Sequence, residues 1–307
     1  MLAFSWYQFW TKPNPDLLNH LLEVASSLNS GGEPTLRHIA EAHFCLGKLY
    51  TYIGRHNDAC QSLERARNEF RKLGTPKDIV RAGESAINLS TTWWFMGKHS
   101  STIKGLIIEA QKDLTNDTKE SAFALMNLGR NYWYSGQTKV GLEMLEDARQ
   151  SLEKFGCTAD VVLCTLYIAR CYAKLCLHTE RMKVGQEALR LAKVIGIDHL
   201  IGDALWNLSC CYVCTGEYDE ALEVLKEALP VAERVGRPLA IAQTLEISGY
   251  TYGMKGDSLG ARLGYEQAKK SYFEMERTHQ TAAGVDRCNH NLQQIEAGAE
   301  LRAPMLN

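Results

Sequence analysis

The chain has 307 residues, with 34 Lys and Arg against 36 Asp and Glu, which gives a net charge of -2 at pH 7. This balance excludes the strongly basic composition that is usual for nucleic-acid-binding chains. A hydrophobic content of 45% with only 7 Pro excludes a disordered chain, so we expect a folded protein with no nucleic-acid partner.

The N-terminal segment is apolar and aromatic up to Trp10, but Thr11 and Lys12 end the run. The run is too short to span a bilayer and lacks the basic start and cleavage site of a signal peptide, so we expect no membrane anchor. Residues 1–35 are predicted to form a truncated N-terminal helical pair. Because exposed aromatic clusters are unfavourable in a monomer, this segment is also a candidate surface for association with a larger assembly.

A repeat of about 40 residues organises the rest of the chain. In each segment a small residue, such as Gly47 or Gly129, is followed by an aromatic residue three positions later, such as Tyr50 or Tyr132. A turn residue follows four positions after the aromatic residue. These turn residues are Gly54, Gly97, Gly136, Cys176, Gly216 and Gly256, with separations of 43, 39, 40, 40 and 40 residues. Each repeat is therefore predicted to be a helix, a tight turn and a second helix.

The second helices carry mostly small residues five and twelve positions after the turn, and we expect these to face the first helix. They are Ala59 and Ala66, Thr102 and Glu109, Gly141 and Ala148, Arg181 and Ala188, Ala221 and Ala228, and Ala261 and Ala268. Thr102 and Arg181, with Gly185, depart from the pattern, which indicates looser packing in the second and fourth repeats. The second helices are predicted to end at glycines in the left-handed conformation, namely Gly74, Gly156, Gly196 and Gly236.

The small, aromatic and glycine positions resemble those of the tetratricopeptide repeat (TPR) family over roughly residues 36–275. A period near 40 is similar to the longer-helix branch of kinesin light chains, spindle-orientation adaptors and arrays attached to signalling ATPases. The resemblance implies an all-α, right-handed α-solenoid of tandem helical hairpins. The predicted units are 36–74, 78–117, 118–156, 159–196, 198–236 and 238–277, followed by a capping helix at 278–298 and a disordered tail at 299–307.

In a stacked array of this kind the first helices line a concave groove, where Asn amides can pair with a peptide backbone and Arg130 and Arg170 can each pair with a carboxylate or a phosphate. The chaperone clamp of the family is not favoured, because Phe44 and Lys48 stand where its Lys and Asn are expected. We predict a partner protein with acidic residues, bound as an extended or helical segment. The alternative is that the Asn side chains cap turns or meet water, the aromatic rings pack between helices, and the Arg side chains pair with Glu on adjacent helices. The predicted peptide-binding groove comprises Lys48, Asn88, Trp94, Asn127, Arg130, Trp133, Tyr134, Tyr167, Arg170, Lys174, Trp206, Asn207 and Tyr250.

The sequence offers little catalytic chemistry. Gly256, Ser258 and Gly260 spell a nucleophile-elbow pattern, but a helix rather than a strand is predicted to precede them. Cys211 and Cys214 lack the second close pair that a structural zinc site needs. We therefore predict no catalytic residue, no metal and no cofactor, and the scattered 10 Cys favour a reducing, cytoplasmic location.

These observations together predict a non-catalytic protein-interaction scaffold. The alternative is a sensor or autoinhibitory segment of a larger multidomain signalling ATPase, which the truncated first unit favours.

Overall fold

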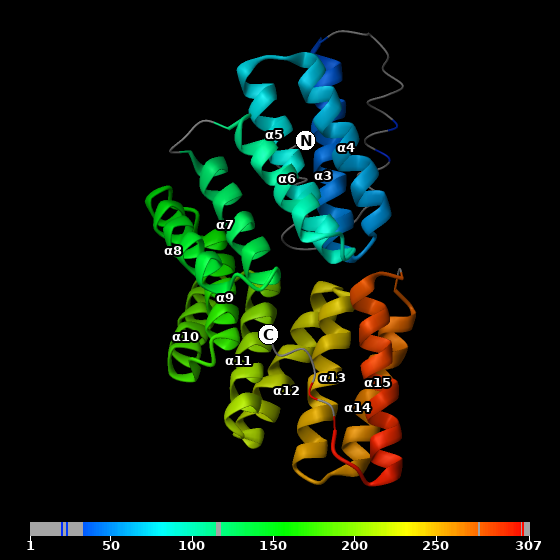
Figure 1. The fold of residues 1–307 in the computed structure, drawn as a ribbon. Coiled ribbons are helices and arrows are strands. Elements are labelled where there is room, and N and C mark those ends of the chain that lie inside the picture. The colour runs from blue at the N-terminus through cyan, green and yellow to red at the C-terminus, as the bar shows by residue number, and fades with distance from the viewer. Residues whose placement is uncertain are drawn as a thin grey trace. The chain divides into compact units, whose positions relative to one another are not determined.

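The computed structural model describes His20, Glu23, residues 33–114, 118–275 and 277–301, and Ala303. Most of the predicted N-terminal pair at 1–35, including its aromatic start, lies outside the described residues. All regular elements in the described part are helices (Figure 1). They are α3 (Glu33–Ile53), α4 (His56–Leu73), α5 (Pro76–Phe95), α6 (Ser100–Gln111), α7 (Lys119–Tyr134), α8 (Thr138–Lys154), α9 (Thr158–Lys174), α10 (His178–Ile195), α11 (Asp198–Thr215), α12 (Tyr218–Val235), α13 (Pro238–Met254), α14 (Ser258–Phe273) and α15 (His279–Ala297).

The helices pack as successive pairs, which confirms the predicted all-α helical repeat fold. We call α3, α5, α7, α9, α11 and α13 the first helices, and α4, α6, α8, α10, α12 and α14 the second helices. Each first helix packs on the second helix that follows it, and α15 packs on α14. The chain divides into two compact units, Met1–Cys157 and Thr158–Asn307. Within the first unit α5 contacts both α3 and α7, and within the second unit α11 contacts both α9 and α13.

Left-handed backbone conformations make the turns between paired helices. All six predicted turn residues have positive φ, from 57° at Cys176 to 86° at Gly136. The glycines predicted to end the second helices also have positive φ, between 68° and 71°. Glycine adopts this region without the Cβ penalty that other residues incur, so its spacing in the sequence located the turns correctly.

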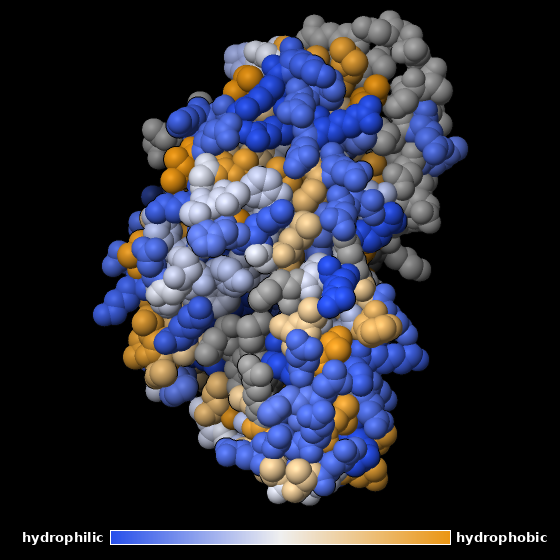
Figure 2. Space-filling view, turned by 45° about the vertical axis from the view of Figure 1, so that its right-hand side comes forward, coloured by the Kyte–Doolittle hydropathy of each residue, from blue (hydrophilic) through white to orange (hydrophobic). Residues whose placement is uncertain are grey.

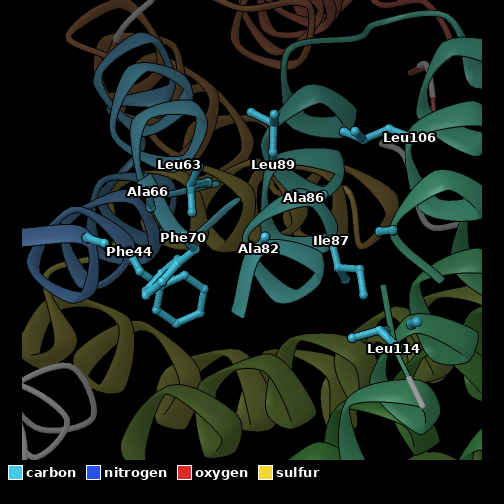
Figure 3. Packing of buried hydrophobic residues seen from close by; sticks show 13 residues of the cluster. Phe44, Leu63, Ala66, Phe70, Ala82, Ala86, Ile87, Leu89, Leu106 and Leu114 are labelled. Carbon is cyan, nitrogen blue, oxygen red and sulfur yellow. The ribbon is translucent and has the colours of Figure 1, made fainter. Parts of the chain in front are cut away.

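The core of the first unit forms where α3 to α7 meet (Figure 3). Phe44 of α3 and Phe70 of α4 lie beside Ala82 of α5, and small residues such as Ala66 and Ala86 let the helices approach closely. Burial of such apolar side chains contributes about 25 cal/mol per Å² to folding, which makes these shared faces the main source of stability.

One predicted register is wrong. Thr102 and Glu109 are exposed, and Ile103 and Ala110 are buried in their place. The reason is the turn length: α6 begins three residues after Gly97, whereas the other second helices begin two residues after their turn residue. The extra residue rotates α6 by one position, so its apolar face starts one residue later than the repeat predicts.

The second unit has its own core clusters around α9 to α15. Arg181 of α10 is fully buried, and its Nη1 donates to Cys214 Sγ at 3.2 Å. A Cβ added to Gly185 would come no closer than 3.7 Å to any neighbouring side chain, which fits the looser packing predicted for this repeat.

The visible surface is mostly hydrophilic, with hydrophobic residues scattered over it (Figure 2). Among the described helices we find none that combines the length and the apolar character needed to cross a bilayer.

Candidate functional site

The first unit brings several predicted groove residues together on α5 and α7. Arg130 Nη2 donates to Thr91 Oγ1 at 2.9 Å, and Thr91 Oγ1 donates to Asn127 Oδ1 at 3.0 Å. The Arg130 guanidinium lies 5.3 Å from the centre of the Trp94 ring, which also meets Tyr134 edge-on at 5.6 Å. We call Thr91, Trp94, Asn127, Arg130 and Tyr134 the Trp94 cluster. Tyr134 is its exposed member, whereas Trp94, Asn127 and Arg130 are buried.

The predicted ladder of asparagine amides is largely engaged by the helices themselves. Asn88 Nδ2 donates to the Glu84 carbonyl at 2.8 Å, and Asn127 Nδ2 donates to the Phe123 carbonyl at 2.9 Å. Both acceptors lie one turn earlier on the same helix. A ligand backbone would therefore have to compete with these bonds, and peptide binding by Asn88 and Asn127 stays a prediction.

Two further predicted groove residues, Lys48 and Trp133, lie on α3 and α7. Lys48 is half-buried on α3, with its Nζ 5.5 Å from the centre of the Phe44 ring. Trp133 is buried where α7 meets α8, since a Cβ added to Gly141 would lie 2.8 Å from the Trp133 backbone nitrogen. The position of Trp133 suits packing between helices, and its role in binding also stays a prediction.

In the second unit a cation and two aromatic rings meet on α9 and α11. The Arg170 guanidinium lies 5.5 Å from the centre of the Tyr167 ring and 5.3 Å from that of Trp206. Trp206 and Tyr250 of α13 pack against one core cluster, and all four side chains are half-buried. Lys174 lies one turn after Arg170 and is exposed. We call Tyr167, Arg170, Lys174, Trp206 and Tyr250 the Arg170 surface.

Asn207 differs from the other asparagines. It is 1% exposed, and neither Oδ1 nor Nδ2 has a hydrogen-bond partner in the described residues. Its Oδ1 lies 3.8 Å from the place where a Gly185 Cβ would be, so the amide faces α10. An unsatisfied buried amide is costly to folding, and peptide binding by Asn207 stays a prediction.

The arrangement of the Arg170 surface suits recognition of a carboxylate. The faces of a guanidinium stack on aromatic rings, while its N–H groups point outward in the guanidinium plane and match the oxygens of a carboxylate. Aromatic residues and Arg are also the residue types that dominate binding energy at protein interfaces.

The serine and cysteine residues considered for catalysis or metal binding lie on helices. Ser258 is the exposed first residue of α14 and follows the helix α13, as expected. Burial raises the pKa of the Cys211 thiol to about 11 and that of Cys210 further still, so both thiols are protonated near neutral pH. In the part of the chain that the structure describes, no three His, Cys, Asp or Glu side chains are arranged to hold a metal ion.

Sequence reasoning did not identify Leu301 as a contact of this region. Leu301 falls in the predicted disordered tail, yet it packs against the last core cluster, as Tyr250 and Leu245 of α13 do. A single leucine after a helix-ending glycine carries no signal in sequence that would reveal such a contact.

Comparisons with known proteins agree with this fold. Residues 161–234 match a family model described as tetratricopeptide repeat. A search of curated proteins found no match. Among solved structures, the chain is similar to the apo form of RapI, with a TM-score of 0.57, 15% identity and coverage of 97% of this chain and 84% of that chain.

Two further solved structures share the arrangement of helices. A Rap protein complexed with competence and sporulation factor has a TM-score of 0.63 and 12% identity, covering 97% of this chain and 86% of that chain. A signal transduction ATPase with numerous domains from Pyrococcus horikoshii, which has a tetratricopeptide repeat sensor, has a TM-score of 0.55 and 13% identity. That alignment covers 93% of this chain and 48% of that chain. At these identities the likeness shows the fold.

Proposed function

We propose that the chain, whose residues 161–234 match a tetratricopeptide repeat model, is a protein-interaction scaffold that binds an acidic segment of a partner protein on its first helices. The observation that carries this proposal is the Arg170 surface, where a guanidinium lies over two aromatic rings. The scaffold needs no chemistry of its own, since its effect comes from holding the partner. A Rap protein of similar fold was solved with a bound factor, which supports a binding role.

Arg170 is expected to pair with a carboxylate of the partner, and Lys174 adds a second positive charge one turn later. Trp206 and Tyr250 supply flat apolar area that loses water on binding. An acidic partner segment with an apolar residue near its carboxylate fits this combination. In the first unit, Tyr134 is the member of the Trp94 cluster best placed to contact a ligand.

A charge reversal tests this proposal. We expect Arg170→Glu to abolish capture of partner proteins from a cell extract, because a carboxylate would then face the partner's carboxylates. Arg190→Glu is the matched control, since Arg190 is exposed on α10 and the change in net charge is the same. Captured proteins are identified by mass spectrometry, and equal far-ultraviolet circular dichroism verifies the fold. Retention of the same partners by the Arg170 variant contradicts the proposal.

A second candidate is a sensor or autoinhibitory segment of a multidomain signalling ATPase. The coverage of nearly the whole chain by part of such an ATPase favours it. An antibody raised against residues 158–307 distinguishes the two candidates on an immunoblot of source-cell extract. A band far above 34.4 kDa supports the sensor, and a band at 34.4 kDa contradicts it.

A further inference from the structure

The chain turns back onto the first helix α13 after α15 ends. Gly298 ends the helix with φ 63°, and the Ala299 backbone N–H donates to the Gln294 carbonyl at 2.9 Å. This left-handed reversal directs the following residues back toward α13 (Figure 1). Residues 299–301 thus approach the helix that carries Tyr250.

Leu301 fills a space that exists because residue 253 is glycine. It is one of the partly buried residues, like Tyr250 and Val285, that pack against the buried cluster of α13, α14 and α15. A Cβ added to Gly253 would overlap the Leu301 side chain. We call this space beside Gly253, bordered by Ala261, the Gly253 seat.

The tail also carries an acidic residue, Glu300, next to Leu301. Tyr250 is half-buried, and its pKa is raised mainly by burial, with Glu300 among the negative groups that add to the shift. Glu300 therefore lies within electrostatic reach of the Arg170 surface member Tyr250. The segment pairs an acidic residue with a leucine, which is the chemistry that we propose for the partner.

We propose that residues 299–301 are an intramolecular ligand of α13, and that they occupy the Gly253 seat that a leucine of an acidic partner segment would take. This inference rests on the proposed function for the partner's identity, but the contact between tail and seat is tested by itself. A partner must then displace Leu301, so the tail sets the affinity of the scaffold for its partners.

Binding of the tail in trans tests the seat. The probe is a fluorescent synthetic peptide of residues 299–307, titrated against full-length variants and followed by fluorescence anisotropy. Leu301→Asp should vacate the seat and bind the peptide at least about tenfold more tightly than the wild type does. In the wild type only the molecules with a vacant seat can bind the peptide, so the apparent affinity is the intrinsic affinity multiplied by that fraction. Adding Gly253→Val to Leu301→Asp should abolish the binding.

Leu263→Asp is the matched control, since Leu263 is 50% exposed on α14, and it should bind the peptide as weakly as the wild type. Equal binding by all variants, or no binding by Leu301→Asp, overturns the proposal.

Limited proteolysis gives a second measurement that does not require the Leu301 variant to fold. Trypsin cleavage after Arg302 should be several-fold faster in Gly253→Val than in the wild type, because the added side chain expels Leu301. Gly105→Ala is the control, since a Cβ at Gly105 meets nothing within 4 Å, and cleavage should not change. Unchanged cleavage in Gly253→Val overturns the proposal. Protection that rises with protein concentration also overturns it, by assigning the seat to the tail of a second copy.

These outcomes are independent of partner capture. If the peptide fails to bind but Arg170→Glu still abolishes capture, the intramolecular ligand is rejected and the scaffold function stands. If the peptide binds and Arg170→Glu captures the same partners as the wild type, the intramolecular ligand stands and the proposed scaffold function is rejected.

Discussion

Cys176 stands where the other five turns have glycine, and it adopts φ 57°. Within the described residues it is the only non-glycine residue with positive φ. For an L-residue this conformation costs about 1–2 kcal/mol, which glycine avoids because it has no Cβ. Part of this gain is offset, because glycine makes the unfolded chain more flexible. The thiol is exposed, so its removal loses little packing.

We therefore expect Cys176→Gly to raise the free energy of unfolding by about 1 kcal/mol in denaturant titrations. Cys176→Ala is the control, because alanine loses the thiol but keeps the Cβ penalty, and it should leave stability nearly unchanged. Equal stabilisation by both variants would assign the effect to the thiol instead of the backbone.

A second residue-scale effect concerns Asp78, a buried carboxylate that links α5 to α3. Arg37 Nε donates to its Oδ1 at 2.9 Å, and Arg37 Nη2 donates to its Oδ2 at 2.8 Å. These bonds from Arg37, opposed by burial and aided by Thr75, lower the pKa of Asp78 from 3.8 to about 2. Because the folded pKa lies below the unfolded one, ionised Asp78 stabilises the fold above pH about 4, and this contribution is lost as pH falls toward 2.

Asp78→Asn tests this, because asparagine resembles the protonated acid. The wild type should be more stable than the variant at pH 5, and the difference should shrink as pH falls from 4 to 2, as measured by thermal unfolding monitored with circular dichroism. A difference that stays constant over this range would contradict the role of ionisation.

At the scale of elements, the helices and their turns were predictable, whereas many of their side-chain partners were not. Glycine spacing located the turns because left-handed turns exclude most other residues. The same spacing placed Thr102 wrongly, since a turn one residue longer leaves no trace in the glycine alignment. Glu246 and Arg287 are 41 residues apart, close to one repeat, but the period does not reveal which charges in neighbouring repeats will meet.

For the candidate site, the sequence indicated which residues the first helices carry but not how deeply they are buried. Asn127 and Arg130 were predicted as contacts for a ligand, yet Thr91 of the neighbouring helix engages both. Burial depends on the side chains that adjacent helices bring, and these come from segments about 40 residues away. The contacts of Leu301 were invisible in the sequence for the same reason.

The effect of a Gly→Ala substitution on stability should depend on how closely the neighbouring helix approaches that glycine. A Cβ at Gly141 of α8 would lie 2.6 Å from the Gly129 carbonyl oxygen of α7, whereas a Cβ at Gly185 of α10 meets no atom closer than 3.7 Å. Gly141→Ala should therefore force the helices apart and cost about 1–3 kcal/mol. Gly185→Ala should stabilise by about 0.5–1 kcal/mol, because alanine favours helix over glycine. Denaturant titrations measure both, and destabilisation of equal size at both positions would contradict the packing argument.

The last helix is attached by a buried ion pair. Arg287 of α15 donates to Glu246 of α13 through Nε at 2.6 Å and Nη2 at 2.9 Å, and the Tyr272 hydroxyl donates to the same carboxylate at 2.8 Å. Removing one partner of a buried pair leaves the other charge uncompensated, which costs about 3–5 kcal/mol.

Arg287→Met should therefore lower the free energy of unfolding by about this amount. Arg262→Met is the matched control, because Arg262 joins α14 to Glu296 of α15 across 3.8 Å at the surface, where a pair contributes about 0–1 kcal/mol. Hydrogen exchange followed by mass spectrometry should show that the Arg287 variant loses protection first in α15. Equal losses in both variants would show that burial of the pair does not decide its strength.

At the scale of the whole molecule, helices within each unit pack mainly on helices close to them in sequence, so the stability of a unit is the sum of repeat and interface contributions. The division at Cys157 and Thr158 leaves each unit with core clusters made from its own residues. A fragment of residues 158–307 should therefore fold alone, with the far-ultraviolet dichroism of a helical protein and a cooperative thermal transition.

A fragment of residues 178–307 is the control, since it lacks α9 and exposes Ala188 and Ala192, which pack with Val162 and Leu166 of that helix. The control should unfold at a lower temperature, because a repeat without its first helix leaves apolar surface in water. An unfolded 158–307 fragment would mean that the core of the second unit needs the first unit to form.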